Sequence, residues 1–258
     1  MRRSAWLLLR FVSVVWAKTP SCGSMTGEVG LFSACEPSDT CPLLSTEHVI
    51  DFGDRELRIR QNRLESSTGS LLWDASVVLA HYVSDHLRPL MQNAKVLELG
   101  CGLGLVSTFC ASLGAHVTAT DRDVDVLAAA LGNARRNGQE LRACPYVWGE
   151  PSELELETYN VIVASDVVYG SEVFEALDRA LWTLSRPLTR VFIALNRRAN
   201  TEWRDFVTLI NQTFTIHQVE QRQLHETYRC DQAGITVFEL SLRRSCPTSS
   251  GLSFLSSP

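Results

Sequence analysis

A cluster of glycines after an apolar run is the first candidate for a ligand site. The run Val96–Leu99 contains one acid, Glu98, and leads into Gly100 to Gly104, which reads Gly-Cys-Gly-Leu-Gly. Glycines permit positive φ angles and let a ligand approach the backbone closely. A dinucleotide fingerprint would need glycine where Leu105 stands, and the loop of phosphate-binding NTPases would need a Gly-Lys-Ser/Thr triplet, which does not follow. The spacing therefore indicates either a loop for a different ligand or a purely structural tight turn.

Two other residues stand at the ends of predicted strands. Asp121 closes the next apolar strand, where a carboxylate can accept both hydroxyls of a ribose. The alternative is that Asp121 or Asp123 only caps the following helix, and both roles can hold if Asp123 starts the helix. Trp148 ends a third strand, before Gly149, where an adenine ring could lie against it. A buried tryptophan that belongs to the core is the alternative.

A fourth segment ends the almost wholly apolar strand Asn160–Ser165. It reads Ser-Asp-Val-Val-Tyr, with Asp166 and Tyr169 three residues apart. Ligands of open α/β sheets bind at the carboxyl ends of the strands, so these side chains are candidates for chemistry. Their structural alternatives are a helix-capping aspartate and a tyrosine that covers the edge of the sheet.

Taken together, these motifs resemble one family. The glycine loop, Trp148, the Asp-x-x-Tyr segment and the stretch Gly69 to Ala75, which reads Gly-Ser-Leu-Leu-Trp-Asp-Ala, look like the class I, seven-strand, S-adenosylmethionine-dependent protein lysine methyltransferases. That family includes the enzymes that act on Hsp70 chaperones, elongation factor 1A and valosin-containing protein. The likeness covers roughly residues 47 to 244, and Leu57 to Gln61 is most like the Hsp70 enzyme.

The resemblance implies roles for particular residues. Asp166 and Tyr169 would be the catalytic residues, beside a channel for the target lysine. Two residues depart from the family pattern: Cys101 stands where relatives have a small Ala or Ser, and Ser165 stands where an alanine is common, so its contact would be mainly through the backbone. The S-adenosylmethionine site would be formed by Trp73, Glu98, Gly100, Cys101, Gly102, Gly104, Asp121, Trp148 and Ser165.

Methyl transfer from a sulfonium to an amine is a direct displacement that needs neither a metal nor a covalent enzyme intermediate. The enzyme must hold the amine in line with the methyl group and supply it uncharged. A lysine ammonium, with a pKa of ~10.4, has to lose its proton, and an apolar channel lowers that pKa. Our hypothesis is that Asp166 attracts and orients the lysine and that Tyr169 forms a wall of the channel. No metal is expected, because the eight cysteines include no Cys-x-x-Cys pair.

Three other functions remain open. Amide and adenine N-methyltransferases share the glycine loop but carry Asn or Asp followed by Pro-Pro-Tyr, where this chain has Val167-Val168. Small-molecule methyltransferases usually carry a lid or a large insertion over the site, whereas the predicted connections here are short. A non-catalytic module that binds the cofactor is the third alternative.

The order of elements predicts a Rossmann-like α/β fold with a mostly parallel sheet. A hairpin around Gly53-Asp54 comes first, and a C-terminal antiparallel pair closes the sheet. The predicted strands are 49–52, 57–61, 95–99, 115–120, 142–148, 160–165, 190–195, 214–219 and 235–242, and the predicted helices are 73–87, leading into Pro89, 105–113, 123–136, 171–184 and 201–212.

The two ends of the chain are predicted to lie outside this domain. Residues 1–45 form an irregular or targeting extension, 46–244 the methyltransferase domain and 245–258 a flexible tail. Residues 1–27 contain no acid and read either as an Arg-rich targeting segment or as an upstream extension with Met25 as an alternative start. Their apolar stretch is shorter than the ~20 residues that span a bilayer, so we expect no transmembrane segment.

Composition narrows the partners and the compartment. The formal net charge is −5, from 24 Lys and Arg against 29 Asp and Glu, which disfavours binding to a phosphate backbone. We therefore expect a protein substrate, such as a chaperone or a translation factor, no nucleic acid, and a monomer. Scattered cysteines suit a reducing compartment. The expected location is the cytoplasm, or the mitochondrion if residues 1–27 act as a targeting segment.

Overall fold

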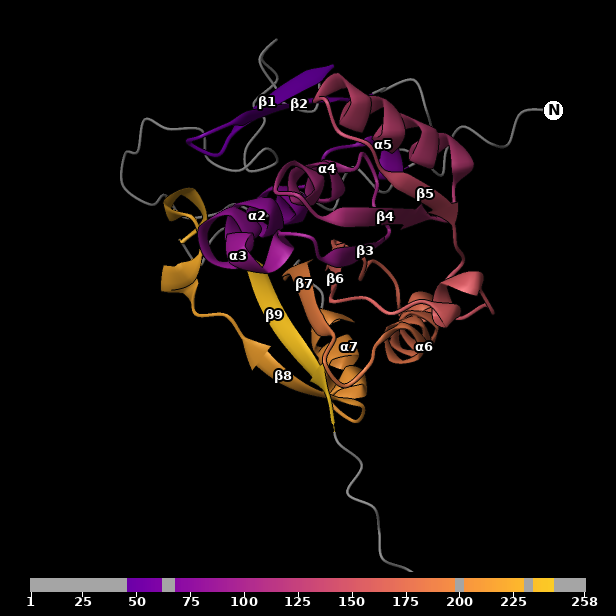
Figure 1. Cartoon of the computed structure of the whole chain (residues 1–258). Helices are drawn as coiled ribbons and strands as arrows, with labels where there is room; N and C mark the ends of the chain where they lie inside the picture. Colours follow the sequence, from indigo (N-terminus) through magenta and orange to yellow (C-terminus); the bar gives the residue numbers. More distant parts are fainter. Residues whose placement is uncertain (1–45, 62–67, 198–201, 230–233, 244–258) are drawn as a thin grey trace, which may run out of the picture.

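A seven-stranded sheet forms the centre of the molecule (Figure 1). The structure is a computed structural model that describes residues 46–61, 68–197, 202–229 and 234–243, so the predictions for 1–45, including 1–27, and for the 245–258 tail lie outside the described residues. The strand order is β5-β4-β3-β6-β7-β9-β8. The first five strands in this order, from β5 through β4, β3 and β6 to β7, are parallel to one another, and β9 pairs antiparallel with both β7 and β8. The Rossmann-like fold with an antiparallel C-terminal pair is confirmed.

Most predicted elements lie within one or two residues of their expected bounds. The strands are β1 Glu47–Asp51, β2 Glu56–Arg60, β3 Lys95–Leu99, β4 His116–Asp121, β5 Arg142–Pro145, β6 Val161–Ser165, β7 Arg190–Asn196, β8 Phe214–Gln218 and β9 Ile235–Leu242. The α-helices are α2 Asp74–Tyr82, α3 Arg88–Met91, α4 Leu105–Ser112, α5 Val124–Arg136, α6 Phe174–Leu184 and α7 Glu202–Ile210.

Helices cover both faces of the sheet. Alternate residues of a strand point to opposite faces, so Val161 and Val163 of β6 pack in the core with α2, α4 and the hairpin, whereas Ile162 and Ala164 pack with α6 and α7. Figure 1 shows these two groups of helices on opposite sides of the sheet. Because both faces are buried, the central strands carry nearly continuous apolar runs.

The hairpin β1–β2 forms a separate two-stranded sheet. The strands pair antiparallel from Glu47 with Arg60 to Asp51 with Glu56, around a turn in which Gly53 has a φ of 84°. Its buried residues, among them Ile50 and Leu57, join the core that contains α2 and α4. Figure 1 shows the hairpin beside α5, at one end of the sheet.

Two predicted boundaries were wrong. The helix after Trp73 does not stop before Pro89: it passes through a π-helical turn, Val83–Leu87, and Pro89 lies in the first turn of α3. Proline is tolerated there because an N–H in the first turn has no intrahelical acceptor. Strand β5 ends at Pro145 rather than at Trp148. Its neighbour β4 ends at Asp121, and the pair Asp121 and Pro145 is the last of the ladder between the two strands. No helix among the described residues is long and apolar enough to span a bilayer.

Candidate active site

The predicted site residues gather where the strand order reverses. Strand β3 lies between β4 and β6, and the three run parallel, so their carboxyl ends share one edge of the sheet. The glycine loop follows β3, Asp121 ends β4, and Ser165 ends β6, directly before Asp166. Such a switch point is the usual place for a ligand in an open α/β sheet.

The glycine loop needs its glycines for backbone shape and for space. Gly100, Gly102 and Gly104 have φ angles of 68°, 51° and 75°, a region that side chains with a Cβ rarely adopt. A Cβ on Gly100 would lie 3.1 Å from Cζ2 of Trp148 and 3.2 Å from Cγ1 of Val167. The loops after β3, β5 and β6 therefore meet at Gly100.

The segment before α2 also reaches this loop. A Cβ on Gly102 would lie 3.4 Å from the carbonyl oxygen of Gly69. Trp73, in the same segment, precedes α2, and its carbonyl oxygen accepts hydrogen bonds from the backbone N–H and the hydroxyl of Ser76, at 2.9 and 2.6 Å. The Gly69 to Ala75 stretch thus has a contact with the glycine loop.

Glu98 lies beneath the loop and faces α4. Its side chain is buried, with 1% of its surface exposed. One carboxyl oxygen accepts hydrogen bonds from the backbone N–H of Ser107, at 2.9 Å, and from the Ser107 hydroxyl. Because the helix begins after Gly104, which has no capping side chain, Glu98 satisfies a first-turn N–H from a distance. Burial raises the pKa of Glu98 to about 8, against the lowering effect of the Ser107 hydrogen bonds.

Of the two acids after β4, Asp123 takes the helix-capping role that the sequence left open. Asp123 is the N-cap of α5 and accepts hydrogen bonds from the N–H groups of Asp125 and Val126. Asp121 is partly buried, and its two oxygens accept the N–H groups of Gly102, at 3.3 Å, and Asp123, at 3.1 Å. Burial raises the pKa of Asp121, whereas these backbone hydrogen bonds oppose the shift. Its carboxylate thus lies beside the glycine loop, where a ribose would be held.

Asp166 and Tyr169 follow β6 on the same edge. Asp166 has a φ of 53°, in the left-handed region, and its N–H donates to the Ala194 carbonyl of β7 at 2.9 Å. The Tyr169 side chain is half exposed, and its ring centroid is 6.4 Å from that of Trp148. Burial is the main cause that raises the pKa of Tyr169, with Arg122 and Asp121 near enough to act on it. The aromatic pair thus connects the loops after β5 and β6.

The remaining predicted residues, Cys101 and Ser165, make mainly backbone contacts. Cys101 is buried, and desolvation raises the pKa of its thiol well above the usual value, so it stays protonated and is no nucleophile. Its N–H donates to the Thr120 carbonyl at 2.8 Å. Ser165, the last residue of β6, is partly exposed and pairs with Ala194.

Three residues of the site were missed in the sequence. Ser107 holds Glu98, Val167 packs against Gly100, and Asn133 of α5 donates to the Leu103 carbonyl of the glycine loop at 3.0 Å. A serine inside a helix or a valine in an apolar stretch gives no local signal of its partner. Asn133 lies on α5, and nothing in its spacing indicates a contact with a loop 30 residues earlier.

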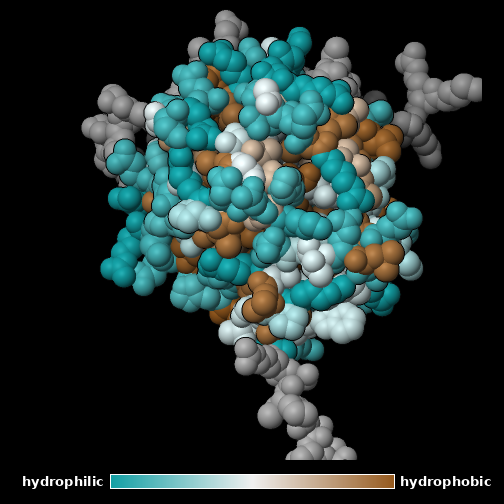
Figure 2. Space-filling view, in the orientation of Figure 1, coloured by the Kyte–Doolittle hydropathy of each residue, from teal (hydrophilic) through white to brown (hydrophobic). Residues whose placement is uncertain are grey.

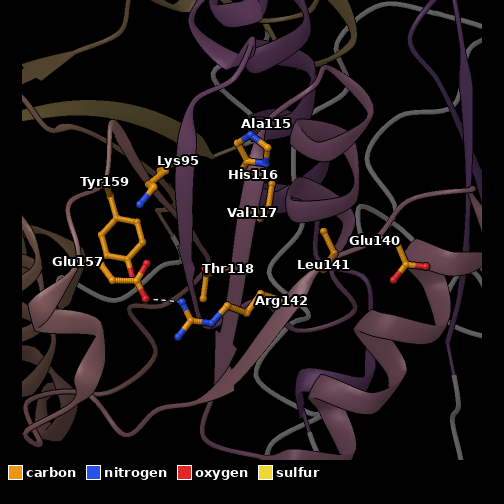
Figure 3. A pocket seen from close by; sticks show the side chains of 10 residues that line it. All are labelled: Lys95, Ala115, His116, Val117, Thr118, Glu140, Leu141, Arg142, Glu157 and Tyr159. Carbon is orange, nitrogen blue, oxygen red and sulfur yellow. Dashed lines mark hydrogen bonds and ion pairs between the residues drawn. The ribbon is translucent and has the colours of Figure 1, made fainter.

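A separate pocket lies at the opposite edge of the sheet. It has a volume of about 460 Å³ and is lined by the first residues of β3, β4 and β5, namely Lys95, His116 and Arg142. Figure 3 shows Arg142 paired there with Glu157. Since the glycine loop follows the other end of β3, this pocket is not the predicted site.

Figure 2 shows one face of the molecule, which is mainly hydrophilic and has smaller hydrophobic areas between the hydrophilic ones.

Comparison with known proteins places these residues in context. A family model described as lysine methyltransferase matches residues 51–213. The protein N-lysine methyltransferase METTL21A of Danio rerio is 31% identical over 196 residues, which is 71% of this chain and 89% of that protein. The EEF1A lysine methyltransferase 3 of Xenopus tropicalis is 27% identical over 81% of this chain and 93% of its own.

Solved structures share the fold. The 16S rRNA methyltransferase RsmC of T. Thermophilus, in complex with AdoMet and guanosine, has a TM-score of 0.59 at 18% identity and covers 76% of this chain and 50% of its own. A SAM-dependent methyltransferase described from Streptococcus mutans has a TM-score of 0.56 at 14% identity, over 77% of this chain and 56% of its own. At these identities the likeness concerns the fold alone.

Proposed function

This chain belongs to the lysine methyltransferase family, whose S-adenosylmethionine-dependent members methylate protein lysines, and we propose that it performs this transfer with Asp166 and Tyr169 on a non-histone protein. One contact carries the assignment of residues. Val167, between Asp166 and Tyr169, packs on Gly100, so the proposed lysine side and the cofactor loop share a boundary. A lysine that reaches Asp166 therefore arrives beside the glycine loop.

The residues of this edge fit S-adenosylmethionine. Three glycines in positive-φ conformations leave alternate positions of the loop without a side chain, Asp121 supplies a carboxylate for the ribose, and Trp148 supplies a ring surface against Gly100. When bound, S-adenosylmethionine supplies a methyl group on a positively charged sulfur. The protein's own task is to hold the cofactor and the amine together.

We propose that Asp166 receives the lysine cation. Its backbone is held by the hydrogen bond to Ala194, in a left-handed conformation that aspartate and asparagine adopt more readily than other residues with a Cβ. A carboxylate attracts the lysine ammonium and orients it, and the rings of Tyr169 and Trp148 exclude water from the carbon chain of the lysine. Desolvation of the ammonium lowers its pKa and favours the uncharged amine that reacts.

The substrate that we propose is a translation factor or a chaperone. The relative named EEF1A lysine methyltransferase 3 spans 81% of this chain, which supports a translation factor. The acidic stretch 150–157 could bind a basic substrate, but it contributes less to that binding than its charge suggests. Glu155 closes a capping box with Ser152, and Glu157 pairs with Arg142, so two of its acids stabilise the fold itself.

Two further proposals concern the state of the protein. We propose that the protein is a monomer. We also propose that it lies in the cytoplasm, because the cysteines in the described part of the chain, Cys101, Cys110 and Cys144, are free thiols, as in a reducing compartment. Sedimentation of the purified chain and imaging of the tagged full-length protein test these statements. Accumulation in mitochondria would instead assign residues 1–27 to targeting.

Asp166→Asn and Tyr169→Phe test the assignment. Asparagine keeps the size of the side chain and tolerates the left-handed backbone, so Asp166→Asn removes charge with little strain. We expect both variants to bind S-adenosylmethionine with a Kd within about twofold of wild type in calorimetry and to lose most transfer to lysate proteins. Undiminished transfer by both variants would refute the roles of Asp166 and Tyr169.

A further inference from the structure

The side chains of Asn133 and Asn137 attach the hairpin to α5. The two asparagines are four residues apart: Asn133 lies in the last turns of α5, and Asn137 is the C-cap residue directly after it. Each uses its amide group as a strand would use a peptide group. Asn137 accepts from the Arg58 N–H at 2.8 Å and donates to the Arg58 carbonyl at 2.9 Å, and Asn133 does the same with Arg60 at 2.9 and 3.0 Å.

This pairing occupies the free edge of β2. The other edge of β2 pairs with β1, and residues two apart in a strand present their N–H and carbonyl groups to the same side. Arg58 and Arg60 are two apart, and the asparagines meet both of them. The hairpin is therefore bound to α5 by four hydrogen bonds, which a shift of register along β2 would break.

Only one of the two asparagines also contacts the glycine loop. The Asn133 amide also donates to the Leu103 carbonyl at 3.0 Å, between Gly102 and Gly104. Asn137 instead donates its third hydrogen bond to the Asn133 carbonyl, within the helix. Asn133 is buried, with 3% of its surface exposed, so the Leu103 carbonyl has no competing access to water at this contact.

Other contacts place α5 against the same loop. A Cβ on Gly104 would lie 2.8 Å from the Ala130 Cβ, one turn before Asn133, so the helix touches the loop at two successive turns. The first residue after β2, Gln61, accepts the N–H of Leu72 at 3.1 Å with its side chain, next to Trp73. The end of the hairpin is thus connected to α5 and to the segment before α2, and each of these contacts the glycine loop.

We propose that Asn133 is a positioning residue, which holds the glycine loop in its cofactor-binding shape and makes the hairpin a support of the cofactor site. The proposal rests on the use of the glycine loop for S-adenosylmethionine. Without the Asn133 amide, the Leu103 carbonyl loses its donor, and the positive-φ conformations on both sides of Leu103 are less constrained. Loss of Asn137 loosens the hairpin alone.

The test compares Asn133→Ala with Asn137→Ala in the full chain. We expect both to lower the thermal unfolding midpoint, since each removes two hydrogen bonds to the hairpin. Only Asn133→Ala should raise the Kd for S-adenosylmethionine, by at least about tenfold in calorimetry, and speed hydrogen exchange at residues 100–104. Asn137→Ala should keep the Kd within about twofold of wild type.

Two further variants make the outcome decisive. Asn133→Asp keeps the size of the side chain and its acceptor for the Arg60 N–H but removes the donor to the Leu103 and Arg60 carbonyls, and it serves if Asn133→Ala does not fold. Asp121→Ala tests the location of the site, and it should weaken cofactor binding whatever Asn133 does. If Asp121→Ala weakens binding while folded Asn133 variants bind like Asn137→Ala, the positioning role is wrong. If Asp121→Ala binds normally, the proposed cofactor site is wrong instead.

Discussion

At the residue scale, Glu98 is an acidic side chain in a buried environment. It is an acid with 1% of its surface exposed, held by a serine from the next helix. The resemblance assigned it to the cofactor, whereas its described hydrogen bonds run to α4. It acts on the glycine loop by joining the strand before the loop to the helix after it.

Glu98 makes stability depend on pH. Its pKa of about 8 in the fold lies above the value of 4.5 expected of the unfolded chain, so the folded state binds more protons between these values. The free energy of unfolding should therefore fall as the pH rises from 4.5 to 8, by at most about 1.4 kcal/mol per pH unit from this group.

Glu98→Gln isolates this effect. The variant keeps an acceptor for both Ser107 donors and cannot ionise, so its free energy of unfolding should lack this component. Denaturant titrations from pH 5 to 9 measure both proteins. The wild type should lose stability relative to Glu98→Gln as the pH rises, and parallel profiles would show that Glu98 does not titrate in this range.

Several site residues could be predicted because their signal is local. A glycine at a given spacing after a strand, or an acid at the end of the next strand, is visible in the sequence. Ser107, Val167 and Asn133 could not be predicted, since their roles arise from contacts between segments that only the fold brings together. Asp166 shows the intermediate case: its position was predicted, and its left-handed backbone was not.

At the scale of elements, the approach of α5 to the glycine loop depends on Gly104. Alanine there would adopt a left-handed φ near 75° and place its Cβ 2.8 Å from that of Ala130. The backbone effect alone costs ~1–2 kcal/mol. We expect Gly104→Ala to exceed that cost, because two packed backbones must also separate.

Gly138→Ala is the matched control for this prediction. Gly138 has a φ of 69°, and a Cβ there meets nothing within 4 Å, so it pays only the backbone cost. Denaturant unfolding should show a larger loss for Gly104→Ala, and Ala130→Gly in the same chain should restore part of the difference. Equal losses at the two glycines would contradict the close packing of α5.

A histidine pair joins α2 to the segment between β8 and β9. The rings of His81 and His225 stack with centroids 4.2 Å apart, and the Phe52 and Tyr228 rings lie beside His81. Burial, aided by the charge of His225, lowers the pKa of His81 to about 4, whereas Asp85 and Asp51 act in the opposite direction. The folded state therefore favours neutral His81.

Acid should loosen this contact. Because the pKa of His81 is lower in the fold than in the unfolded chain, the stability that it contributes is present above pH 6.5 and is lost as the pH falls towards 4. His81→Phe keeps an aromatic ring and removes the titration. Thermal unfolding between pH 4 and 7 should show a shallower acid loss for this variant, and an identical slope would contradict the prediction.

Helices and strands were predictable where the hydrophobic periodicity agrees with the capping and turn residues at the ends of the segment. The stretch Asp123 to Gly138 carries a capping acid, an amphipathic helix and a glycine stop, and α5 follows it closely. The end of β5 was not predictable, because it depends on where the neighbouring strand stops. The π-helical turn before Pro89 is likewise set by packing rather than by any local motif.

At the scale of the whole molecule, the low lysine content makes methylation of a substrate easy to distinguish from self-methylation. The chain has a net charge of −5, and Lys18 and Lys95 are its only lysines. Methyl label in a lysate protein is therefore readily separated from self-methylation, which could involve only these two lysine side chains. Lys95 lies at the edge of the sheet opposite the glycine loop.

The most direct measurement is the identity of the acceptor atom. Wild type and Asp166→Asn are incubated with labelled S-adenosylmethionine and cell lysate, and the labelled products are located by mass spectrometry. We predict that wild type places methyl groups on the side-chain nitrogen of a lysine in a protein, and that Asp166→Asn does so far less at equal cofactor affinity. Label found only in small molecules, or on protein residues other than lysine, would contradict the account.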